Sequence, residues 1–425
     1  MGAVVVVGAQ WGDEGKGKVV DFLAADFDFV VRFHGGSNAG HTVRAGGRTF
    51  KFSHIPSGVL RENCRLVIAN GVVVEPVRLL EEIDNLKAGG IDLTGRLVIS
   101  RDCHVTFPYH ITLEAINAAA KKGKWDPYSI RRGNGPTHAD KFAYLGIKVA
   151  DLFHPKTLSG KLTINAILKR DLFRAFGHEE PSVDQLMERY QFFAERLEPY
   201  VGETVALLHH ALDKGARLLM EGAQGTFLDV DHGVYPFVSA SNAVAGAVNA
   251  GAGIPPRAID RVIGVAKAYL TRFGGGPFPT EMDPERAEAV RQKGGEIGVN
   301  LPEPRRVGWL DIEMLRTAAK LSGIDELVLT KIDVLSESPK LLMGVGVKIG
   351  KSEISYLAER DPEVIAAAEP QYVSFEPWSE DLTQIRRFAQ LPWRAKDYIE
   401  AIEGLVDVPI SIVSVGPDRD QTIFR

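Results

Sequence analysis

The chain has 425 residues, with 50 Lys and Arg against 55 Asp and Glu, so its formal net charge is −5 at neutral pH. A composition of 45% hydrophobic and 25% charged residues is typical of a soluble globular protein and argues against disorder, collagen or a nucleic-acid coat. Since no apolar run is long enough to cross a membrane and Met1-Gly2 precedes no signal-peptide pattern, we expect neither a membrane nor a nucleic-acid partner.

The N-terminal segment begins with an apolar, β-branched run at residues 3–8, which predicts a buried strand ending in glycine. Helical periodicity follows over residues 15–25. A strand, a glycine-rich loop and a helix in this order open an α/β nucleotide-binding unit.

The same alternation continues along the chain. Apolar runs predict further strands at residues 29–33, 66–68, 97–100, 218–221, 263–266, 327–331 and 410–415. Helical segments are expected at residues 76–86, 110–122, 183–210 and 311–321, and ordered surface loops at residues 125–141 and 273–279. The pattern predicts an α/β fold with a large, mostly parallel central sheet covered by helices, around a P-loop-like nucleotide-binding core with insertions.

The first strand is followed by the loop Gly8-Ala-Gln-Trp-Gly-Asp-Glu-Gly-Lys-Gly-Lys18. This loop resembles a P-loop, in which backbone N–H groups and a lysine hold phosphates. It is longer than the ordinary motif before Gly15-Lys16, and Gly17 stands where a Mg²⁺-binding hydroxyl residue is usual. We interpret Asp13 as the substitute, either a hard oxygen ligand for Mg²⁺ or a proton-transfer group. A glycine-rich turn with solvated charges is the alternative.

A second candidate motif is Thr330-Lys-Ile-Asp333, after an apolar strand. The Asp333 carboxylate can accept from guanine N1–H and its amine as a two-point pair, while the Lys331 stem lies over the base. Four residues alone also fit a polar strand end. Combined with the modified P-loop, they indicate a GTP site.

A third glycine-rich loop, Gly35-Gly-Ser-Asn-Ala-Gly-His-Thr42, brings the Asn38 amide and the His41 imidazole together. A histidine near a transferring phosphate can donate a proton or stabilise charge on the leaving oxygen, although a lone histidine more often has a structural role. The loop at residues 221–225 repeats the pattern, with Gln224 as its candidate polar contact.

Six motifs together resemble the adenylosuccinate synthetase family in content and order. They are Trp11-Gly-Asp-Glu-Gly-Lys-Gly-Lys18, Asn38-Ala-Gly-His-Thr42, Glu221-Gly-Ala-Gln-Gly-Thr226, Gly308-Trp-Leu-Asp311, Thr330-Lys-Ile-Asp333 and Gly416-Pro-Asp-Arg419. The resemblance implies one large domain over residues 1–425, with excursions at about 76–215 and 273–310, in a cytoplasmic homodimer. Two cysteines, Cys64 and Cys103, offer no disulfide framework, which fits a reducing cytoplasm.

The resemblance also implies a reaction: GTP phosphorylates the 6-oxygen of IMP, and the amine of L-aspartate then displaces phosphate to give adenylosuccinate and GDP. Asp13 would be the base at N1 and, with the Gly40 carbonyl, a ligand of one Mg²⁺ ion. His41 would be the acid on the phosphate side, with Lys16 and Gln224 completing the catalytic set.

The binding residues implied by the resemblance fall into three groups. For GTP they are Gly12, Glu14, Gly15, Lys16, Gly17, Lys18, Gly40, His41, Thr42, Arg305, Lys331, Ile332, Asp333, Ser414, Val415 and Gly416. For the acceptor nucleotide they are Asn38, Ala39, Ile130, Arg131, Tyr144, Gln224, Ser239 and Glu303. The loop for the amine substrate would contain Val299, Asn300, Leu301, Glu303 and Arg305.

Several acceptor positions depart from the family pattern. Ile130 replaces a threonine that binds the IMP phosphate, and Tyr144 replaces an arginine that reaches the neighbouring subunit's IMP. Leu301 and Glu303 replace a threonine and an arginine of the aspartate loop, and a carboxylate there repels a dicarboxylate substrate. Arg131 is an extra cation that offers one compensation.

Three functions therefore compete. The first is the family's ordinary ligase reaction with compensated pockets, which the global resemblance favours. The second is a related GTP-dependent ligase that uses another oxo-nucleotide or another amine. The third is a GTP-binding regulatory protein without ligase chemistry, which would have no need of Asp13, His41 and Gln224.

Overall fold

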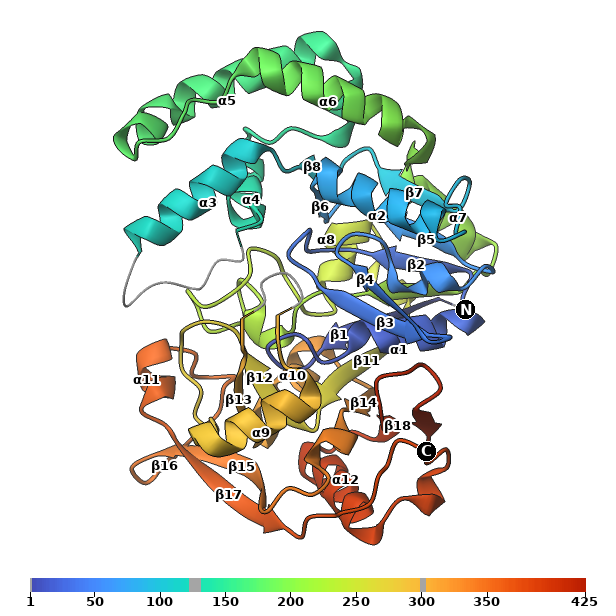
Figure 1. The fold of residues 1–425 in the computed structure, drawn as a ribbon, viewed down its shortest axis with the longest axis vertical. Coiled ribbons are helices and arrows are strands. Elements are labelled where there is room, and N and C mark those ends of the chain that lie inside the picture. Colours follow the sequence, from blue (N-terminus) through green and yellow to red (C-terminus); the bar gives the residue numbers. More distant parts are fainter. Residues whose placement is uncertain (1, 122–130, 299–302) are drawn as a thin grey trace.

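The computed structural model describes residues 2–121, 131–298 and 303–425, and its centre is a ten-stranded sheet (Figure 1). The strand order is β19-β18-β14-β11-β1-β10-β2-β5-β7-β9. All neighbouring pairs are parallel except β18 with β19, which confirms the predicted fold class. The strands are β1 (Ala3–Gly8), β2 (Phe29–Arg32), β5 (Arg65–Ile68), β7 (Leu97–Ser100), β9 (Val201–Gly202), β10 (Leu218–Glu221), β11 (Ile259–Lys267), β14 (Glu326–Thr330), β18 (Ile410–Ser414) and β19 (Thr422–Phe424).

Strand β1 separates two hydrophobic cores. Val5 and Val7 pack into one core and Val4 and Val6 into the other, because successive side chains of a strand point to opposite faces. Both faces are covered, so the strand is apolar throughout rather than alternating.

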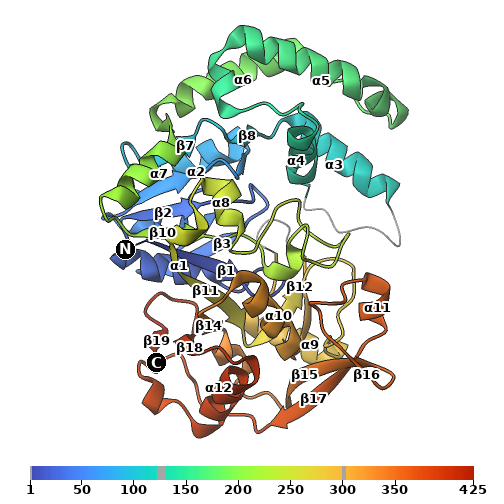
Figure 2. The same ribbon diagram turned by 180° about the vertical axis from the view of Figure 1, so that it is seen from behind.

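Helices cover each face of the sheet, as the two opposite views show (Figures 1 and 2). Helices α1 (Lys16–Leu23) and α2 (Pro76–Ala88) contribute buried side chains to the core around Val4. The opposite core receives α7 (Thr204–Asp213), α8 (Ala247–Ala252), α10 (Ile312–Ser322) and α12 (Trp393–Val406).

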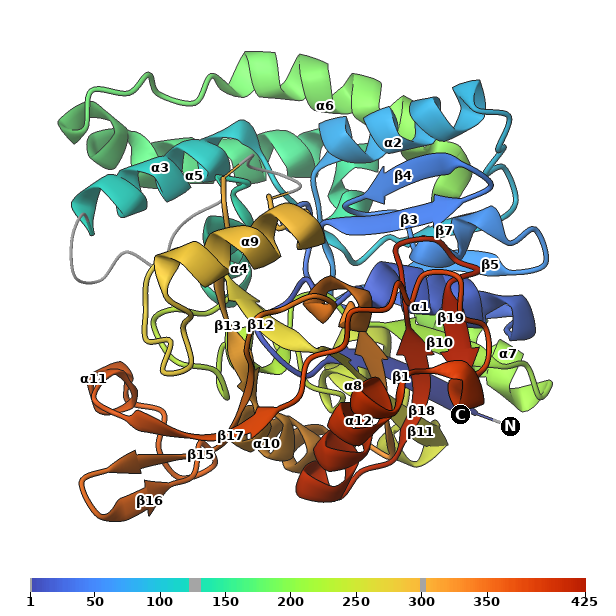
Figure 3. The same ribbon diagram turned by 60° about the horizontal axis from the view of Figure 1, so that its bottom comes forward.

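Two groups of elements extend beyond the central layers. One is helical, with α3 (Pro108–Ala120), α4 (Asn134–Phe142), α5 (Pro155–Ala175) and α6 (Val183–Leu197), and α5 and α6 form its outer layer in Figure 1. The other contains β12 (Tyr269–Arg272), β13 (Arg306–Asp311), β15 (Leu341–Ile349), β16 (Ser352–Ile354), β17 (Glu369–Phe375), α9 (Pro284–Gly294) and α11 (Pro362–Ala366). Figure 3 shows β15 to β17 projecting away from the body. The remaining pairs are β3 (His41–Ala45) with β4 (Arg48–Phe52), and β6 (Val73–Val74) with β8 (His104–Val105).

Three sequence predictions were wrong in their extent. The strand predicted at residues 263–266 is longer in the structure, where β11 runs over Ile259–Lys267. The helix predicted at residues 183–210 is divided into α6 and α7 by the short strand β9, and Pro199 and Gly202 at the break explain why. The loop predicted at residues 125–141 contains α4 from Asn134 onward, where Pro136 lies in the first turn and its missing N–H is harmless. Residues 122–130 of that prediction lie outside the described part.

Candidate active site

A pocket of about 1140 Å³ opens at the carboxyl ends of the central strands. Parallel α/β sheets bind ligands at this edge, because loops from several strands converge there. Five lining segments each follow one strand: residues 11–13 and 15–18 after β1, 38–42 after β2, Gln224 after β10, Lys331 after β14 and Gly416 after β18. The topology therefore gathers motifs that are far apart in the sequence.

The P-loop-like turn is held by an internal carboxylate. Glu14 accepts hydrogen bonds from the backbone N–H of Gln10 (3.1 Å) and Gly12 (2.8 Å), and pairs with Lys16 at 2.5 Å. Because the Glu14 side chain is fully buried, only the main chain of this residue can contact a phosphate. Gly15 precedes α1 with a φ of 92°, a conformation that favours glycine.

Gly17 has a steric reason for standing where a P-loop has a hydroxyl residue. A Cβ atom at this position would lie 2.9 Å from the Cβ of His41, which is closer than real contacts allow. The glycine thus lets helix α1 approach the histidine. Any Mg²⁺ ligand must therefore come from another residue, as Asp13 was predicted to provide.

His41 is oriented by a buried carboxylate. Its Nδ1 lies 2.5 Å from Glu221 Oε1, and the same carboxylate accepts from Ser57 N (2.8 Å) and Ser57 Oγ (2.6 Å). Burial lowers the pKa of His41 although the carboxylate opposes this shift. With Nδ1 donating to Glu221, Nε2 is the nitrogen left for a ligand, and His41 lines the pocket.

Of the predicted guanine-binding residues, Lys331, Ser414 and Gly416 line the pocket, whereas Ile332, Asp333 and Val415 do not. Lys331 adopts a φ of 59°. The Asp333 Oδ1 atom is buried without a hydrogen-bond partner, and burial raises the pKa of this carboxyl. An orphaned acceptor of this kind fits the N–H groups of a guanine base. The side chains of Ile332 and Val415 lie in the core, so only their main chain is available.

Lys18 joins the start of α1 to the C-terminal loop. Its Nζ donates to Ser414 Oγ (2.7 Å) and to the carbonyls of Gly416 (2.7 Å) and Gln421 (2.9 Å). Burial lowers its pKa to about 8. Lys18 therefore braces two walls of the candidate GTP site, whereas Lys16 lies in the phosphate-binding turn itself.

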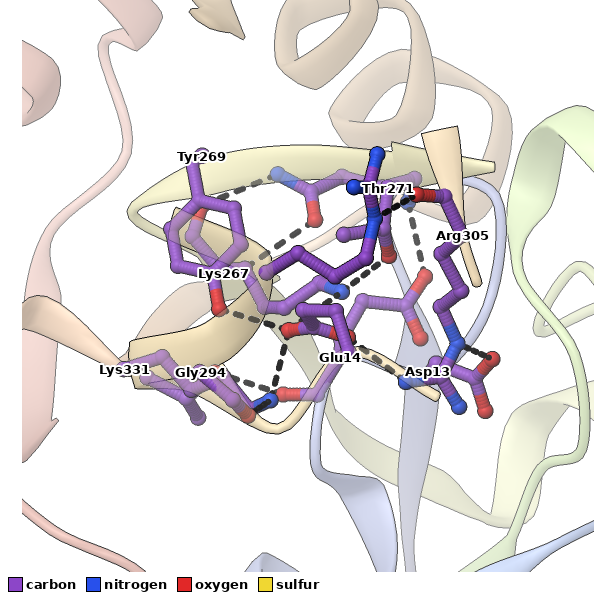
Figure 4. Close-up of polar contacts among 12 residues, drawn as sticks. Asp13, Glu14, Lys267, Tyr269, Thr271, Gly294, Arg305 and Lys331 are labelled. Carbon is purple, nitrogen blue, oxygen red and sulfur yellow. Dashed lines mark hydrogen bonds and ion pairs between the residues drawn. The ribbon is translucent and has the colours of Figure 1, made fainter. Parts of the chain in front are cut away.

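Asp13 lies beside Arg305, as Figure 4 shows. Arg305 Nε is 3.0 Å from Asp13 Oδ2, and the Asp13 side chain is 30% exposed. Asp13, Gly40 and Arg305 all line the pocket, as does Thr42. In the described part of the chain, no group of three or more His, Cys, Asp or Glu residues is placed to hold a metal ion by itself.

The acceptor side contains a second orphaned group. Both amide atoms of Gln224 are buried without a hydrogen-bond partner, and the residue has a φ of 52°. Asn38 Nδ2 lies 3.5 Å from Ser239 Oγ and its Oδ1 accepts from Gly36 N at 3.1 Å. Asn38, Ala39, Ser239 and Gln224 all line the pocket.

The remaining acceptor residues are not brought to this pocket. Arg131, Tyr144 and Glu303 lie outside the wall formed by the described residues, and Tyr144 is 97% exposed. Ile130, Val299, Asn300 and Leu301 fall outside the described residues.

Known proteins resemble the chain over its whole length. A family model described as adenylosuccinate synthetase matches residues 5–423. Adenylosuccinate synthetases of Syntrophobacter fumaroxidans and Caldanaerobacter subterraneus are each 46% identical over 426 residues, covering 100% of this chain and 99% of each relative. That of Clostridium perfringens is 44% identical with the same coverage.

The chain belongs to the adenylosuccinate synthetase family. A solved structure of the fully ligated enzyme from Plasmodium falciparum agrees, with a TM-score of 0.94, 34% identity and 100% coverage of both chains. The fold is also shared by cyanophage S-2L succinoaminodeoxyadenylate synthetase. That structure has a TM-score of 0.64 and 19% identity, and the match covers 100% of this chain and 95% of the cyanophage chain.

Membership of the adenylosuccinate synthetase family defines the activity. The chain is a ligase of purine and AMP biosynthesis that uses GTP to join IMP and aspartate into adenylosuccinate. The first of the three competing functions is therefore the one supported, and the regulatory protein without ligase chemistry is not.

Two buried residues next to the pocket wall escaped the sequence interpretation. Glu296 and Lys267 are both fully buried beside Arg305 and Lys331. Neither belongs to a recognisable motif, because a single Glu before a loop and a single Lys at a strand end are common in any chain. Only the contacts reveal them.

Proposed function

We propose that the ligase reaction takes place in the 1140 Å³ pocket with Asp13, Gln224 and His41 around the reacting atoms. One observation carries the assignment: these three residues follow β1, β10 and β2, which are consecutive neighbours in the central sheet. Neighbouring strands lie about 4.8 Å apart, so the three loops start close together at one edge of the sheet. Asp13, His41 and Gln224 all line the pocket there.

In the first step, Asp13 accepts the N1 proton of IMP while the 6-oxygen attacks the γ-phosphorus of GTP. The bond from O6 to phosphorus forms, the bond to the β-phosphate oxygen breaks, and GDP leaves. His41 stabilises the charge that develops on the phosphate side, held in place by Glu221. Lys16 and the main-chain N–H groups of the turn hold the phosphates.

In the second step, the uncharged aspartate amine attacks C6, phosphate leaves with the former 6-oxygen, and the amine nitrogen releases one proton to water or to the departing phosphate. Phosphorylation is needed because an unmodified amide-like oxygen is a poor leaving group. The Gln224 amide, which has no partner in the protein, is positioned to bind the acceptor base. Arg305 and the loop that precedes it are assigned to the amine substrate.

We further propose that one Mg²⁺ ion binds with the Asp13 carboxylate and the Gly40 carbonyl as its protein ligands. Hard oxygen donors suit this ion, and a site with few protein ligands is typical where substrate phosphates supply the rest. The ion would neutralise phosphate charge during transfer. The exposed part of the Asp13 carboxylate faces the pocket that Gly40 also lines, which supports the fit.

We propose that the protein is a homodimer in the cytoplasm. Each subunit is one large domain over residues 1–425, with the two excursions at about 76–215 and 273–310. Helix α5 presents an exposed apolar row made of Ile164, Ile167, Leu168, Leu172 and Phe176. A hydrogen bond from Asn165 Nδ2 to the Leu145 carbonyl places the exposed Tyr144 beside this row. We propose that a second copy of the chain covers this row. Both cysteines are free and buried, which fits a reducing compartment.

Phosphate release from GTP tests the site assignment when each ligand is omitted in turn. We expect turnover only with GTP, Mg²⁺, IMP and aspartate all present, since the amine must discharge the phosphorylated intermediate for the enzyme to recycle. Steady GTP hydrolysis without any acceptor nucleotide would contradict the assignment of Asp13, because its proton would then have no source in IMP.

A further inference from the structure

A buried carboxylate, that of Glu296, has four polar partners, Lys331, Tyr269, Arg305 and Lys267, all labelled in Figure 4. Glu296 is 0% exposed. Its Oε1 accepts from Lys331 Nζ at 2.6 Å and from the Tyr269 hydroxyl at 2.5 Å, and its Oε2 accepts from Arg305 at 2.6 Å. Lys267 Nζ is 3.5 Å away.

We propose that Glu296 is a positioning residue that fixes two substrate-binding cations at once, Lys331 for the guanine base and Arg305 for the amine loop. This inference rests on the roles proposed above for those two cations. Glu296 itself does not line the pocket. It acts through the residues that it holds.

The geometry at Lys331 supports the first half. Lys331 adopts the left-handed backbone conformation. Its amino group donates hydrogen bonds to Glu296 and to the Gly294 carbonyl, the latter at 2.9 Å. With the charged end fixed, the aliphatic stem is held against the pocket, where it can cover a flat base. Without the carboxylate, the flexible side chain loses this arrangement and the base loses a preformed surface.

The geometry at Arg305 supports the second half. Arg305 and Glu296 are paired at one end of a narrow backbone ladder. In this ladder Arg305 N donates to the Glu296 carbonyl (3.1 Å) and Gly298 N donates to the Glu303 carbonyl (3.0 Å). Gly298 and Glu303, the described residues on either side of residues 299–302, belong to this ladder. The ion pair between the side chains therefore fixes the base of the loop and the direction of the guanidinium.

The charges at this point make Glu296 hard to replace. Burial alone raises the pKa of Glu296, but Lys267, Lys331 and Arg305 outweigh it and hold the pKa far below its usual range. The carboxylate thus stays ionised among three cations. An uncharged substitute would leave Lys331 and Arg305 repelling one another and free to turn elsewhere.

The test is Glu296→Gln, which keeps the shape of the side chain and removes its charge. Binding of a fluorescent GDP derivative is measured by titration, and KM is measured for aspartate and for IMP. We expect the Kd for the GDP derivative and the KM for aspartate each to rise about tenfold or more, while the KM for IMP changes by less than about twofold. No change, a rise for only one of the two ligands, or an equal rise for IMP would overturn the proposal.

The matched control is Lys267→Met, which removes a buried charge next to the same carboxylate but leaves both of its other cations in place. Lys267 does not line the pocket. Nucleotide binding by this variant should stay within about twofold of the wild type. If it falls as far as in Glu296→Gln, general disruption of the buried cluster is the cause and the proposal fails.

Should Glu296→Gln not be recovered folded, Tyr269→Phe removes only the neutral donor that orients the carboxylate. We then expect a smaller weakening of GDP binding, about two- to fivefold, and unchanged binding overturns the proposal. A failure of the ligase assignment gives a different result. The wild type would then form no adenylosuccinate, while Glu296→Gln would still weaken binding of the GDP derivative.

Discussion

At the scale of single residues, the proposed reaction depends most on the side chain of Asp13. The Asp13 carboxylate lies 3.0 Å from Arg305 and is partly exposed to the pocket. The neighbouring Glu14 is buried, and its carboxylate accepts hydrogen bonds from backbone N–H groups. Two adjacent carboxylates thus have different tasks, one structural and one facing substrate. This division is visible only in the contacts, because both residues belong to the same motif.

We predict that Asp13→Ala abolishes turnover and leaves GTP binding largely intact, because the phosphate-holding turn is braced by Glu14 and not by Asp13. Single-turnover product formation and nucleotide titration measure the two properties separately. Glu14→Gln is the comparison, and there we expect weaker GTP binding through loss of the Lys16 pair. Unchanged turnover in Asp13→Ala would refute the mechanism.

A buried lysine gives the protein a pH-dependent stability. Burial lowers the pKa of Lys267 to about 8 from the usual 10.5, with Lys331 and Arg305 adding to the shift and Glu296 opposing it. The charged form is thus penalised in the folded state below pH 8, and the penalty is relieved as the pH rises from 8 towards 10.5.

We therefore predict that the free energy of unfolding of the wild type, relative to Lys267→Met, increases by about 2 kcal/mol between about pH 7.5 and 9.5, using 1.36 kcal/mol per pH unit. Denaturant titrations of both proteins at each pH measure this difference. A constant or a decreasing difference would show that the lysine is not desolvated in the folded protein.

At the scale of elements, the sequence was most informative where burial is complete. Strands β1, β7 and β10 were predicted with their observed bounds, since both of their faces are covered and glycine or polar residues end them. Strand β15 was missed, because Gly344 and Gly346 and several half-buried positions dilute its pattern. Local periodicity does not report an element whose stability comes from its neighbours.

Helix α5 allows a test of the proposed homodimer. Its apolar row has nothing to cover it within the described part of one chain, and a charge placed in an apolar interface prevents association. We predict that Leu168→Glu converts the protein to monomers in sedimentation equilibrium. Lys156→Glu, at an exposed position near the start of the same helix, should leave the assembly unchanged. A wild type that sediments as a monomer would refute the dimer itself.

At the scale of the whole molecule, five strand ends bring residues from 11 to 417 around one pocket. The motifs in the sequence predicted a GTP site, because phosphate and guanine recognition need particular residues at short spacing. Lys16, Lys331 and Gly416 of these motifs line the pocket, and their binding of GTP stays a prediction. The buried carboxylates Glu221 and Glu296 could not be anticipated in their roles, since each acts on a residue more than 30 positions away in the sequence. Long-range partners of this kind depend on the order of strands in the sheet.

The substitutions in the acceptor and amine loops make product identity the decisive question. Mass analysis of the product formed from GTP, Mg²⁺, IMP and aspartate, beside a panel of other purine nucleotides and amines, answers it directly. We predict adenylosuccinate as the product, at a rate well above that of any other pair. No product with IMP and aspartate, together with steady turnover of another nucleotide or amine, would contradict the account.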